Sequence, residues 1–187
     1  MKDILEKILN VSNNELNLLN TGFINRYNFF HDTSYFHLES GKEHYRLLMY
    51  ISSLFNKEIL FDIGTHKCMS AAALSYSMKN RIKTYDIKQY IVINPLLAGV
   101  GYNIGNATKD KDLEKSPFIF FDAAHDGVFE NIFYNHLKNI NWKGLLLLDD
   151  INECSNEMTE FWNSIKDEKY DISHIGHWSG TGLVYIK

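Results

Sequence analysis

Cysteine and proline are scarce in this chain of 187 residues, which contains two of each. Cys68 and Cys154 lie far apart, without the spacing of a metal site or a disulfide framework, and this indicates a reducing compartment. The prolines, Pro95 and Pro117, mark no linker, and no low-complexity segment divides the chain. We therefore expect a single domain over residues 1–187.

The sequence also lacks long apolar runs and an excess of positive charge. No segment reaches the roughly 20 apolar residues of a membrane span. The first residues carry acids and asparagines where a signal peptide needs an apolar stretch. The formal net charge is -4, which argues against binding to a nucleic-acid backbone. We expect a cytoplasmic protein with no nucleic-acid or membrane partner, whose oligomeric state, a homo-oligomer included, stays open.

Residues 1–57 are predicted to form a helical cap. Apolar residues recur at helical spacing, and Ser12 with Glu15, like Ser40 with Glu43, has the spacing of a capping box. In a capping box the hydroxyl and the carboxylate satisfy free backbone amides at a helix start. Each pair therefore predicts the beginning of a helix.

The segment 22–37, GFINRYNFFHDTSYFH, is crowded with aromatic residues and has no clean period. Aromatic side chains most often fill cores, so the segment can pack between the helices and the rest of the chain. It can equally form a lid or a wall of a substrate pocket. Both interpretations stay open.

From residue 58 onward, short apolar runs alternate with helical patterns. Continuous apolar runs indicate strands covered on both faces, and their alternation with helices indicates a parallel sheet. A turn and a short helix are expected near Asn94 and Pro95. Residues 170–186 resemble two strands joined by a Gly-rich tight turn, which requires an antiparallel strand. We predict a doubly wound, mostly parallel α/β sheet over residues 58–187, with an antiparallel C-terminal hairpin strand.

An acid follows each of several predicted strands. In such sheets, ligands bind outside the carboxyl ends of the strands. A solvated strand end explains any one acid alone, but several acids at one edge indicate a site. The five acids are Asp62, Asp86, Asp122, Asp149 and Asp150.

The order of these residues over roughly 58–187 resembles that of class I S-adenosylmethionine-dependent methyltransferases. The resemblance implies a seven-stranded, Rossmann-like sheet with S-adenosylmethionine as the cofactor. The segment FDIGTHKCMS, residues 61–70, is similar to the first strand and cofactor loop, with Asp62 and Gly64 at the family's acid and glycine positions. Asp86 matches the acid that accepts hydrogen bonds from the ribose hydroxyls.

The resemblance implies further cofactor contacts around this loop. Ser70 opens the next helix, where its hydroxyl and the free amides suit a carboxylate such as that of methionine. The other implied contacts are Thr65 and His66 in the loop, Asn106 and Ala107 near the adenine, and Asp122.

Cys68 departs from the family pattern, which usually has a second glycine at this position. A thiol there would crowd the methionine part of the cofactor if the backbone needs a positive φ. We interpret Cys68 as a small buried side chain rather than a nucleophile.

Within this class the chain looks most like the divalent-cation-dependent O-methyltransferases of catechol, caffeoyl and macrolide-sugar type. Their metal-binding acids correspond to Asp122, Asp149 and Asp150. Mg²⁺ prefers oxygen ligands and keeps positions open for substrate oxygens. The resemblance therefore implies Mg²⁺ or another divalent cation, and methyl transfer to a hydroxylated small molecule, a sugar or glycan component among them. Alternatively, one acid of the pair Asp149–Asp150 caps the next helix and the other is solvated.

His125 stands three residues after Asp122, where catechol-type enzymes have a lysine base. Imidazole can abstract a proton at neutral pH, so the resemblance implies that His125, together with Asp122, is catalytic. Alternatively, His125 caps the following helix or holds a metal-binding residue in place without touching the metal or the substrate. His174 and His177, which flank the predicted hairpin turn, are interpreted as structural.

Two further functions stay open. A non-catalytic cofactor-binding or scaffold protein with the same fold would tolerate Cys68 and the short length of the chain. A nicotinamide-dependent oxidoreductase would also place an acid after the second strand. Here, however, the loop GTHKCMS, residues 64–70, lacks the G-x-G-x-x-G pattern that lets the backbone approach a pyrophosphate.

Overall fold

The computed structural model describes the chain except for a few short gaps. The described residues are 1–29, 32–89, 93–94, 96–152 and 155–187. Pro95 and Cys154, which entered the predictions above, lie outside the described residues. Within the described ranges, no helix has the length and apolar character needed to cross a membrane.

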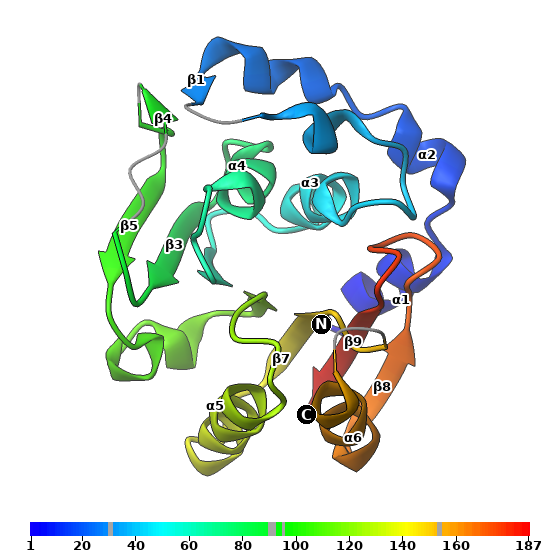
Figure 1. The fold of residues 1–187 in the computed structure, drawn as a ribbon, viewed down its shortest axis with the longest axis vertical. Coiled ribbons are helices and arrows are strands. Elements are labelled where there is room, and N and C mark those ends of the chain that lie inside the picture. The colour runs from blue at the N-terminus through cyan, green and yellow to red at the C-terminus, as the bar shows by residue number, and fades with distance from the viewer. Residues whose placement is uncertain (30–31, 90–92, 95, 153–154) are drawn as a thin grey trace.

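A seven-stranded sheet forms the centre of the molecule (Figure 1). Its strands are β2 (Ile59–Ile63), β3 (Arg81–Asp86), β5 (Val100–Ile104), β6 (Phe118–Phe121), β7 (Gly144–Asp149), β8 (Glu168–Asp171) and β9 (Thr181–Ile186). The order across the sheet is β5-β3-β2-β6-β7-β9-β8. In the part β5-β3-β2-β6-β7, neighbouring strands pair in parallel, whereas β9 is antiparallel to both β7 and β8. The predicted doubly wound, mostly parallel sheet with an antiparallel C-terminal strand is confirmed.

The strand order reverses between β2 and β6. From β2 the chain moves outward through β3 to β5, then returns to β6 on the other side of β2 and continues to β7. In doubly wound sheets the loops at such a reversal diverge and leave a crevice at the carboxyl ends of the strands. The carboxyl ends of β2, β3, β6 and β7 therefore define where a ligand binds.

Helices cover both faces of the sheet, with α3 and α4 on one side and α5 and α6 on the other (Figure 1). The α-helices are α1 (Lys2–Asn10), α2 (Asn13–Asn17), α3 (Tyr45–Leu54), α4 (Met69–Ser75), α5 (Val128–Asn139) and α6 (Asn156–Ser164). The short 3₁₀ helices are η1 (Thr21–Arg26), η2 (Ser34–His37), η3 (Ala107–Lys109) and η4 (Leu113–Lys115). A small antiparallel pair of strands, β1 (Asn28–Phe29) and β4 (Ile93–Asn94), completes the described elements. Asn94, near which a short helix was expected, pairs with β1 instead, while residues 90–92 and Pro95 lie outside the described residues.

The four leucines of β7 show why its sequence is continuously apolar. Leu145 and Leu147 belong to the core under α1, α3 and α4, whereas Leu146 and Leu148 belong to the core under α5 and α6. Successive side chains of a strand point to opposite faces, so a strand covered on both sides needs an apolar residue at every position. The strand then ends at Asp149, at the edge that carries the crevice.

Only one of the two predicted capping boxes forms. Ser12 and Glu15 cap α2 in both directions. The second prediction is wrong, because α3 begins at Tyr45, after His44 as N-cap, and has no side-chain cap. The Ser40 hydroxyl instead donates to the carbonyl of Asn13, which ties the turn before α3 to α2.

The connection between β8 and β9 is longer than the predicted tight turn. It spans residues 172–180 and folds back over the end of β7. The amide of Ile151 donates to the carbonyl of Gly180 at 3.3 Å, and the amide of Asn152 donates to the carbonyl of Ser179 at 3.1 Å. The length of the connection therefore follows from its packing against the residues just after β7.

The aromatic segment 22–37 combines both of its predicted roles in the residues that the structure describes. Phe36 is fully buried and stacks on Tyr45 with ring centroids 5.2 Å apart. Asp32 and Tyr35, by contrast, line a cavity at the crevice. The segment packs the cap against the sheet and also forms part of a pocket wall.

Candidate functional site

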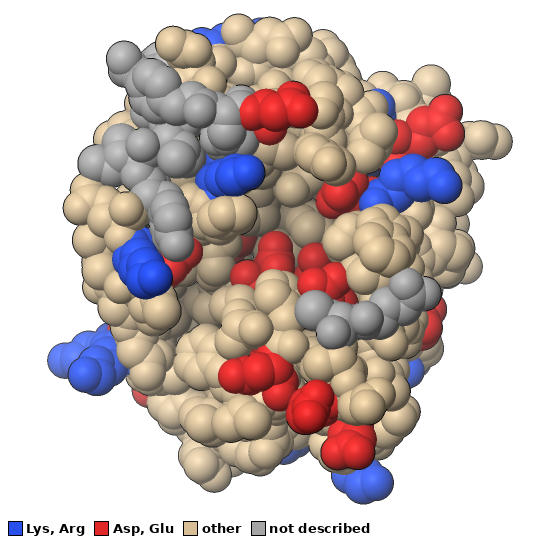
Figure 2. Space-filling model, viewed as in Figure 1, with Lys and Arg blue, Asp and Glu red and all other residues tan. Residues whose placement is uncertain are grey.

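Two cavities open at the carboxyl ends of the parallel strands. The larger has a volume of about 520 Å³ and the smaller about 350 Å³. Gly64, His66 and Asp122 line both of them, so the cavities meet at the ends of β2 and β6. The molecular surface is hollowed here, with acidic side chains gathered inside the hollow (Figure 2).

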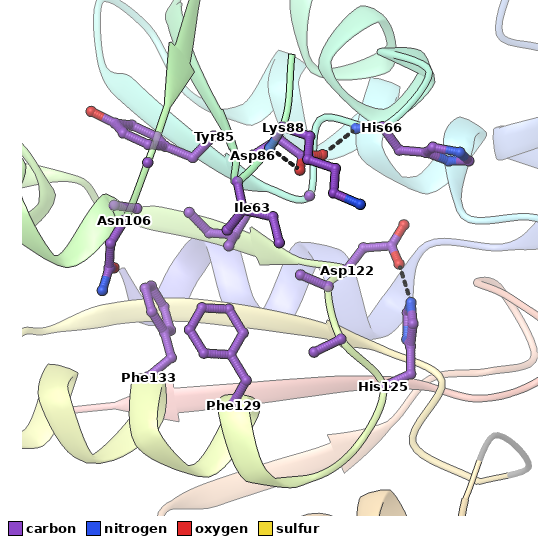
Figure 3. A pocket seen from close by; sticks show the side chains of 16 residues that line it. Ile63, His66, Tyr85, Asp86, Lys88, Asn106, Asp122, His125, Phe129 and Phe133 are labelled. Atoms are coloured by element: carbon purple, nitrogen blue, oxygen red, sulfur yellow. Dashed lines mark hydrogen bonds and ion pairs between the residues drawn. The ribbon is translucent and has the colours of Figure 1, made fainter. Parts of the chain in front are cut away.

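The larger cavity joins an apolar slot to a carboxylate (Figure 3). Phe129 and Phe133 of α5 lie on one side of it and Asp86, the last residue of β3, on the other. Asp86 accepts hydrogen bonds from the backbone amides of His66 at 2.9 Å and Lys88 at 3.2 Å. Flat apolar groups and a fixed acceptor suit a nucleoside, whose base is apolar on its faces and whose ribose presents hydroxyl donors.

Asn106 and Ala107 line the same cavity from the loop after β5. The Asn106 side chain accepts a hydrogen bond from the amide of Thr108 at 3.0 Å and so caps η3. Ala107 is buried. The structure therefore brings both of these predicted residues into one cavity with Asp86.

Gly64 allows the loop after β2 to pass very close to β6. Its φ is +108°, and a Cβ at this position would lie 1.8 Å from the carbonyl oxygen of Asp122. The amides of Gly64 and Thr65 both donate to the carbonyl of Tyr85, at 2.8 and 3.1 Å. Only glycine meets both the dihedral and the space requirement at this turn.

Asp62 lies beneath the loop rather than in the described lining of either cavity. It is fully buried and accepts a hydrogen bond from the Thr84 hydroxyl at 2.6 Å. Burial raises the pKa of Asp62 to about 6, although hydrogen bonds from Thr84 and Ser70 oppose this rise. Its direct contact with a cofactor stays a prediction, while Thr65 and Ser70, both buried, do line the smaller cavity.

Cys68 precedes α4 with a φ of 64° and is fully buried, as expected from the sequence. Burial raises the pKa of its thiol to about 12, so the thiol stays protonated at neutral pH. A protonated, inaccessible sulfur cannot act as a nucleophile.

Asp149 stands at the centre of a cluster of acids and histidines. It is 5% exposed. Its Oδ2 lies 3.3 Å from Nδ1 of His44, the residue before α3, and 3.3 Å from Nδ1 of His177, in the connection between β8 and β9. Burial disfavours its ionised form, but the two histidines outweigh burial and hold the pKa of Asp149 well below its usual range.

Asp150 has left the strand, which resolves how two successive carboxylates can face one site. Its φ of 58° lies in the left-handed region, so its side chain no longer alternates with that of Asp149. Its Oδ1 accepts a hydrogen bond from the Ser179 hydroxyl, and its Oδ2 lies 3.1 Å from Nδ1 of His125. Neither acid caps α6, whose N-cap is Ser155.

His125 bridges the two acidic strand ends. Its Nε2 lies 3.3 Å from Oδ1 of Asp122 (Figure 3), and its Nδ1 lies 3.1 Å from Oδ2 of Asp150. Partial burial and the nearby charge of Asp149 raise the pKa of Asp122 to about 7. The His125 side chain does not cap α5, since Asp126 accepts hydrogen bonds from its first amides.

Glu130 fixes the loop that carries His125. Ala124 and His125 both have positive φ, 67° and 56°. The buried carboxylate of Glu130 accepts a hydrogen bond from the His125 amide at 2.7 Å. This contact holds a left-handed loop in the geometry that aims the imidazole between the two acids.

The cluster contains donor atoms that an ion could satisfy. Among the described residues, both ring nitrogens of His44 and Oδ1 of Asp149 are buried without a hydrogen-bond partner. Groups of three whose ligand atoms lie within 4.8 Å of one another are His44–Asp122–Asp149, Asp149–Asp150–His177 and Glu43–His44–His177. The predicted metal acids thus fall into two groups that share Asp149, and the donor set fits a divalent cation.

Glu43, His44 and His177 join this cluster although the sequence did not indicate them as site residues. His177, interpreted from the sequence as structural, lies against Asp149 and Asp150, at 3.3 and 3.4 Å. Its signal was the polar stretch 177–181 inside an otherwise strand-like segment. Glu43 and His44 carried no such signal, because they lie more than 100 residues before Asp149 in the chain.

Comparisons with known proteins relate the fold to a set of solved structures. No protein-family model matches the chain, and no curated protein matches its sequence. An O-methyltransferase from Bacillus cereus in complex with SAH (S-adenosylhomocysteine) is 16% identical, with a TM-score of 0.53 over 99% of this chain and 91% of that one. An SAH-bound methyltransferase from Podospora anserina is 14% identical, with a TM-score of 0.55 over 76% and 78%. A methyltransferase from Geobacter sulfurreducens is 13% identical, with a TM-score of 0.51 over 76% and 77%.

Proposed function

We propose that this chain, which has the fold of class I S-adenosylmethionine-dependent methyltransferases, transfers a methyl group from S-adenosylmethionine to a hydroxyl of a small molecule. The observation that carries the proposal is the pair of cavities that meet at Gly64, His66 and Asp122. One cavity is an apolar slot with an acid, and the other is lined by acids and histidines. A cofactor and an acceptor bound in them would meet at their junction.

The larger cavity suits the adenosine half of the cofactor. Asp86 would accept hydrogen bonds from the two ribose hydroxyls, since the amides of His66 and Lys88 already orient its carboxylate. Phe129 and Phe133 would pack against the adenine. The methionine half would then run past Gly64, which lines both cavities at their junction.

The smaller cavity suits the methyl acceptor. Its volume of about 350 Å³ is at the lower end of the range for small-molecule sites. Asp32, Tyr35, Thr65 and Ser70 are among the residues that line it. Hydroxylated ring compounds, including sugars and glycan components, present the oxygens that such a polar wall recognises.

His125 is placed to receive the proton of the acceptor hydroxyl. The oxygen would attack the methyl carbon as the carbon–sulfur bond breaks, so that the sulfonium becomes a neutral thioether and the released proton passes to the imidazole. Asp122 and Asp150 flank the imidazole and orient it. Positioning and charge stabilisation supply most of the acceleration in such a displacement.

A divalent cation fits the acids and histidines around Asp149. Buried donors without hydrogen-bond partners, namely Oδ1 of Asp149 and the His44 nitrogens, support its presence in the working protein. When bound, it would lower the pKa of a coordinated hydroxyl and hold the resulting oxyanion. Asp149 and Asp150 would hold it next to the junction of the cavities.

Methyl transfer from isotopically labelled S-adenosylmethionine to a panel of catechols, sugars and glycans tests the function. We expect transfer that EDTA abolishes and that is lost in Asp149→Ala/Asp150→Ala. Asp171→Ala is the control, because Asp171 also ends a strand at this edge yet lies outside the described lining of both cavities. Transfer unchanged by EDTA and by the double substitution would remove the cation from the mechanism. Cofactor binding without transfer to any acceptor would favour a non-catalytic binding protein. An increase in NADH fluorescence on adding the protein would favour a nicotinamide site.

A further inference from the structure

We propose that the cation site is a mixed histidine–carboxylate site, in which His44 and His177 join Asp149 as ligands, and that it takes a transition-series divalent cation in preference to Mg²⁺. The cations meant are those of the Mn²⁺, Fe²⁺, Co²⁺ and Zn²⁺ class. The inference rests on the proposed function only in that this cation assists methyl transfer. The residues themselves determine which ion binds.

The spacing of the donor atoms is that of neighbouring ligands in one coordination shell. Nδ1 of His44 and Nδ1 of His177 each lie 3.3 Å from the same atom, Oδ2 of Asp149. With metal–ligand bonds of about 2.0–2.2 Å, adjacent ligand atoms of a tetrahedral or octahedral shell lie about 3.0–3.6 Å apart. His44 and His177 each join Asp149 in a separate group of ligand atoms that lie within 4.8 Å of one another, so one ion held by all three residues requires the two rings to move towards each other.

Of the three proposed ligands, His44 gives the strongest support for a bound cation. It is 3% exposed, and neither of its ring nitrogens has a hydrogen-bond partner among the described residues. Its ring packs against Tyr45 and Phe120, with centroids 4.6 and 4.8 Å apart, which fixes its orientation. Apart from the ion-pair contact of Nδ1 with Asp149, the ring has no polar partner among the described residues, and since buried polar atoms are normally satisfied, this indicates a missing partner. A cation between them satisfies both at once.

His177 has the surroundings of a metal-bound histidine. Its Nδ1 faces Asp149, while its other nitrogen, Nε2, lies 3.7 Å from Oε1 of Glu43. Metal-ligating histidines usually place a carboxylate at the nitrogen that does not bind the metal, which fixes the tautomer and the ring. Glu43 is therefore assigned as the residue that orients His177.

The donor atoms of this site favour first-row transition-metal cations over Mg²⁺. Mg²⁺ is hard, takes oxygen ligands and retains its waters, so imidazole is a poor ligand for it. Imidazole nitrogen suits the later first-row divalent cations, and carboxylates bind both classes. Replacing oxygen donors with two histidines thus shifts selectivity away from Mg²⁺.

Spectroscopy on the full chain, stripped of metal with EDTA and reloaded, tests this inference directly. With one Mn²⁺ bound per chain, pulsed electron paramagnetic resonance should show couplings to imidazole nitrogen. Calorimetric titration should show Co²⁺ binding much more tightly than Mg²⁺. We expect His44→Gln and His177→Gln each to weaken Co²⁺ binding by at least about tenfold and to leave Mg²⁺ binding nearly unchanged. His174→Gln, an exposed histidine of the same connection, is the matched control and should change neither.

Two outcomes would overturn the inference. Mn²⁺ binding without nitrogen couplings would show that carboxylates alone hold the ion. Failure to bind Co²⁺ or Mn²⁺ would show that the histidines serve only as counter-ions of Asp149 and Asp150. If His44→Gln does not fold, as checked by circular dichroism, the wild-type spectrum still decides. Binding of S-adenosylhomocysteine to the metal-free protein, measured separately, distinguishes failure of this inference from failure of the proposed function.

Discussion

The backbone amide of His66 donates a hydrogen bond to Oδ2 of Asp86 at 2.9 Å. This contact ties the loop after β2 to the end of β3 at the mouth of the larger cavity (Figure 3). Asp86 therefore has two roles, as the anchor of the loop and as an acceptor that faces the cavity. Its removal should affect ligand binding more than any other single change in that cavity.

Asp86→Ala should weaken binding of S-adenosylhomocysteine. A hydrogen bond to a charged group contributes about 1.5–3 kcal/mol, so the loss of one or both ribose contacts should lower the affinity by at least about tenfold. Isothermal titration calorimetry measures this change. Asp171→Ala, at the exposed end of β8, should bind as the wild type does. Equal affinities for Asp86→Ala and wild type would place the nucleoside elsewhere.

Gly64→Ala should destabilise the fold more than Gly105→Ala. Both glycines have positive φ, +108° and +124°, so alanine costs about 1–2 kcal/mol of conformational energy at either position. Only at Gly64 does the new Cβ collide with a backbone atom, the carbonyl oxygen of Asp122, whereas nothing lies within 4 Å at Gly105. Urea unfolding of the two variants should show the larger loss for Gly64→Ala, and equal losses would contradict the close approach of β2 and β6.

Asp62→Asn should stabilise the protein at neutral pH. The carboxyl ionises near pH 3.8 in the unfolded chain, but burial raises its folded pKa to about 6. The folded state thus binds the extra proton between these values, and the free energy of unfolding falls as the pH rises from about 4 to 6. The asparagine cannot ionise, so Asp62→Asn should gain up to about 3 kcal/mol above pH 6 and nothing near pH 4.

Asp171→Asn should change the free energy of unfolding at neutral pH in the opposite direction to Asp62→Asn. Although burial opposes it, the hydrogen bonds from Ser173 keep the pKa of Asp171 below its ordinary value, so the ionised carboxylate stabilises the fold at neutral pH. Asp171→Asn should therefore lose stability at pH 7.5, and the loss should shrink as the pH falls through the pKa. Urea unfolding of both variants at pH 3, 4 and 7.5 measures the two effects, the lowest pH being needed for the decrease at Asp171. A neutral or destabilising effect of Asp62→Asn at pH 7.5 would contradict the account, in which ionisation of the buried Asp62 carboxyl lowers the stability of the fold.

Cys68 should resist alkylation in the folded protein. Its thiol is fully buried, and with a pKa of about 12 only about one molecule in 10,000 carries a thiolate at pH 8. Iodoacetamide labelling at pH 8, followed by peptide mapping, should show Cys68 unmodified until urea unfolds the chain. Rapid labelling of Cys68 under native conditions would contradict its burial.

The sequence was sufficient to predict the sheet and the edge at which the acids meet. The carboxyl ends of parallel strands share an edge, so Asp86, Asp122 and Asp149 could be brought together from the strand pattern alone. The left-handed backbone of Asp150 could not be predicted, because aspartate carries no strong signal for a positive φ. That dihedral, however, is what turns two successive carboxylates towards one site.

The long-range contacts that complete the site could not be predicted from the sequence. His44 reaches Asp149 only because α3 packs across β6 and β7, and nothing in the local sequence around His44 encodes that contact. His177 reaches it because residues 172–180 fold over the end of β7 instead of making a tight turn. The capping-box spacing of Ser40 and Glu43 was misleading for the same reason, since Glu43 turns towards His177.

Calorimetric titration of the protein with S-adenosylhomocysteine tests the central claim most directly. If the joined cavities form a cofactor site, one molecule should bind per chain, Asp86→Ala should weaken the binding, and Asp171→Ala should leave it unchanged. The absence of binding at millimolar ligand, in protein shown to be folded by circular dichroism, would contradict the claim.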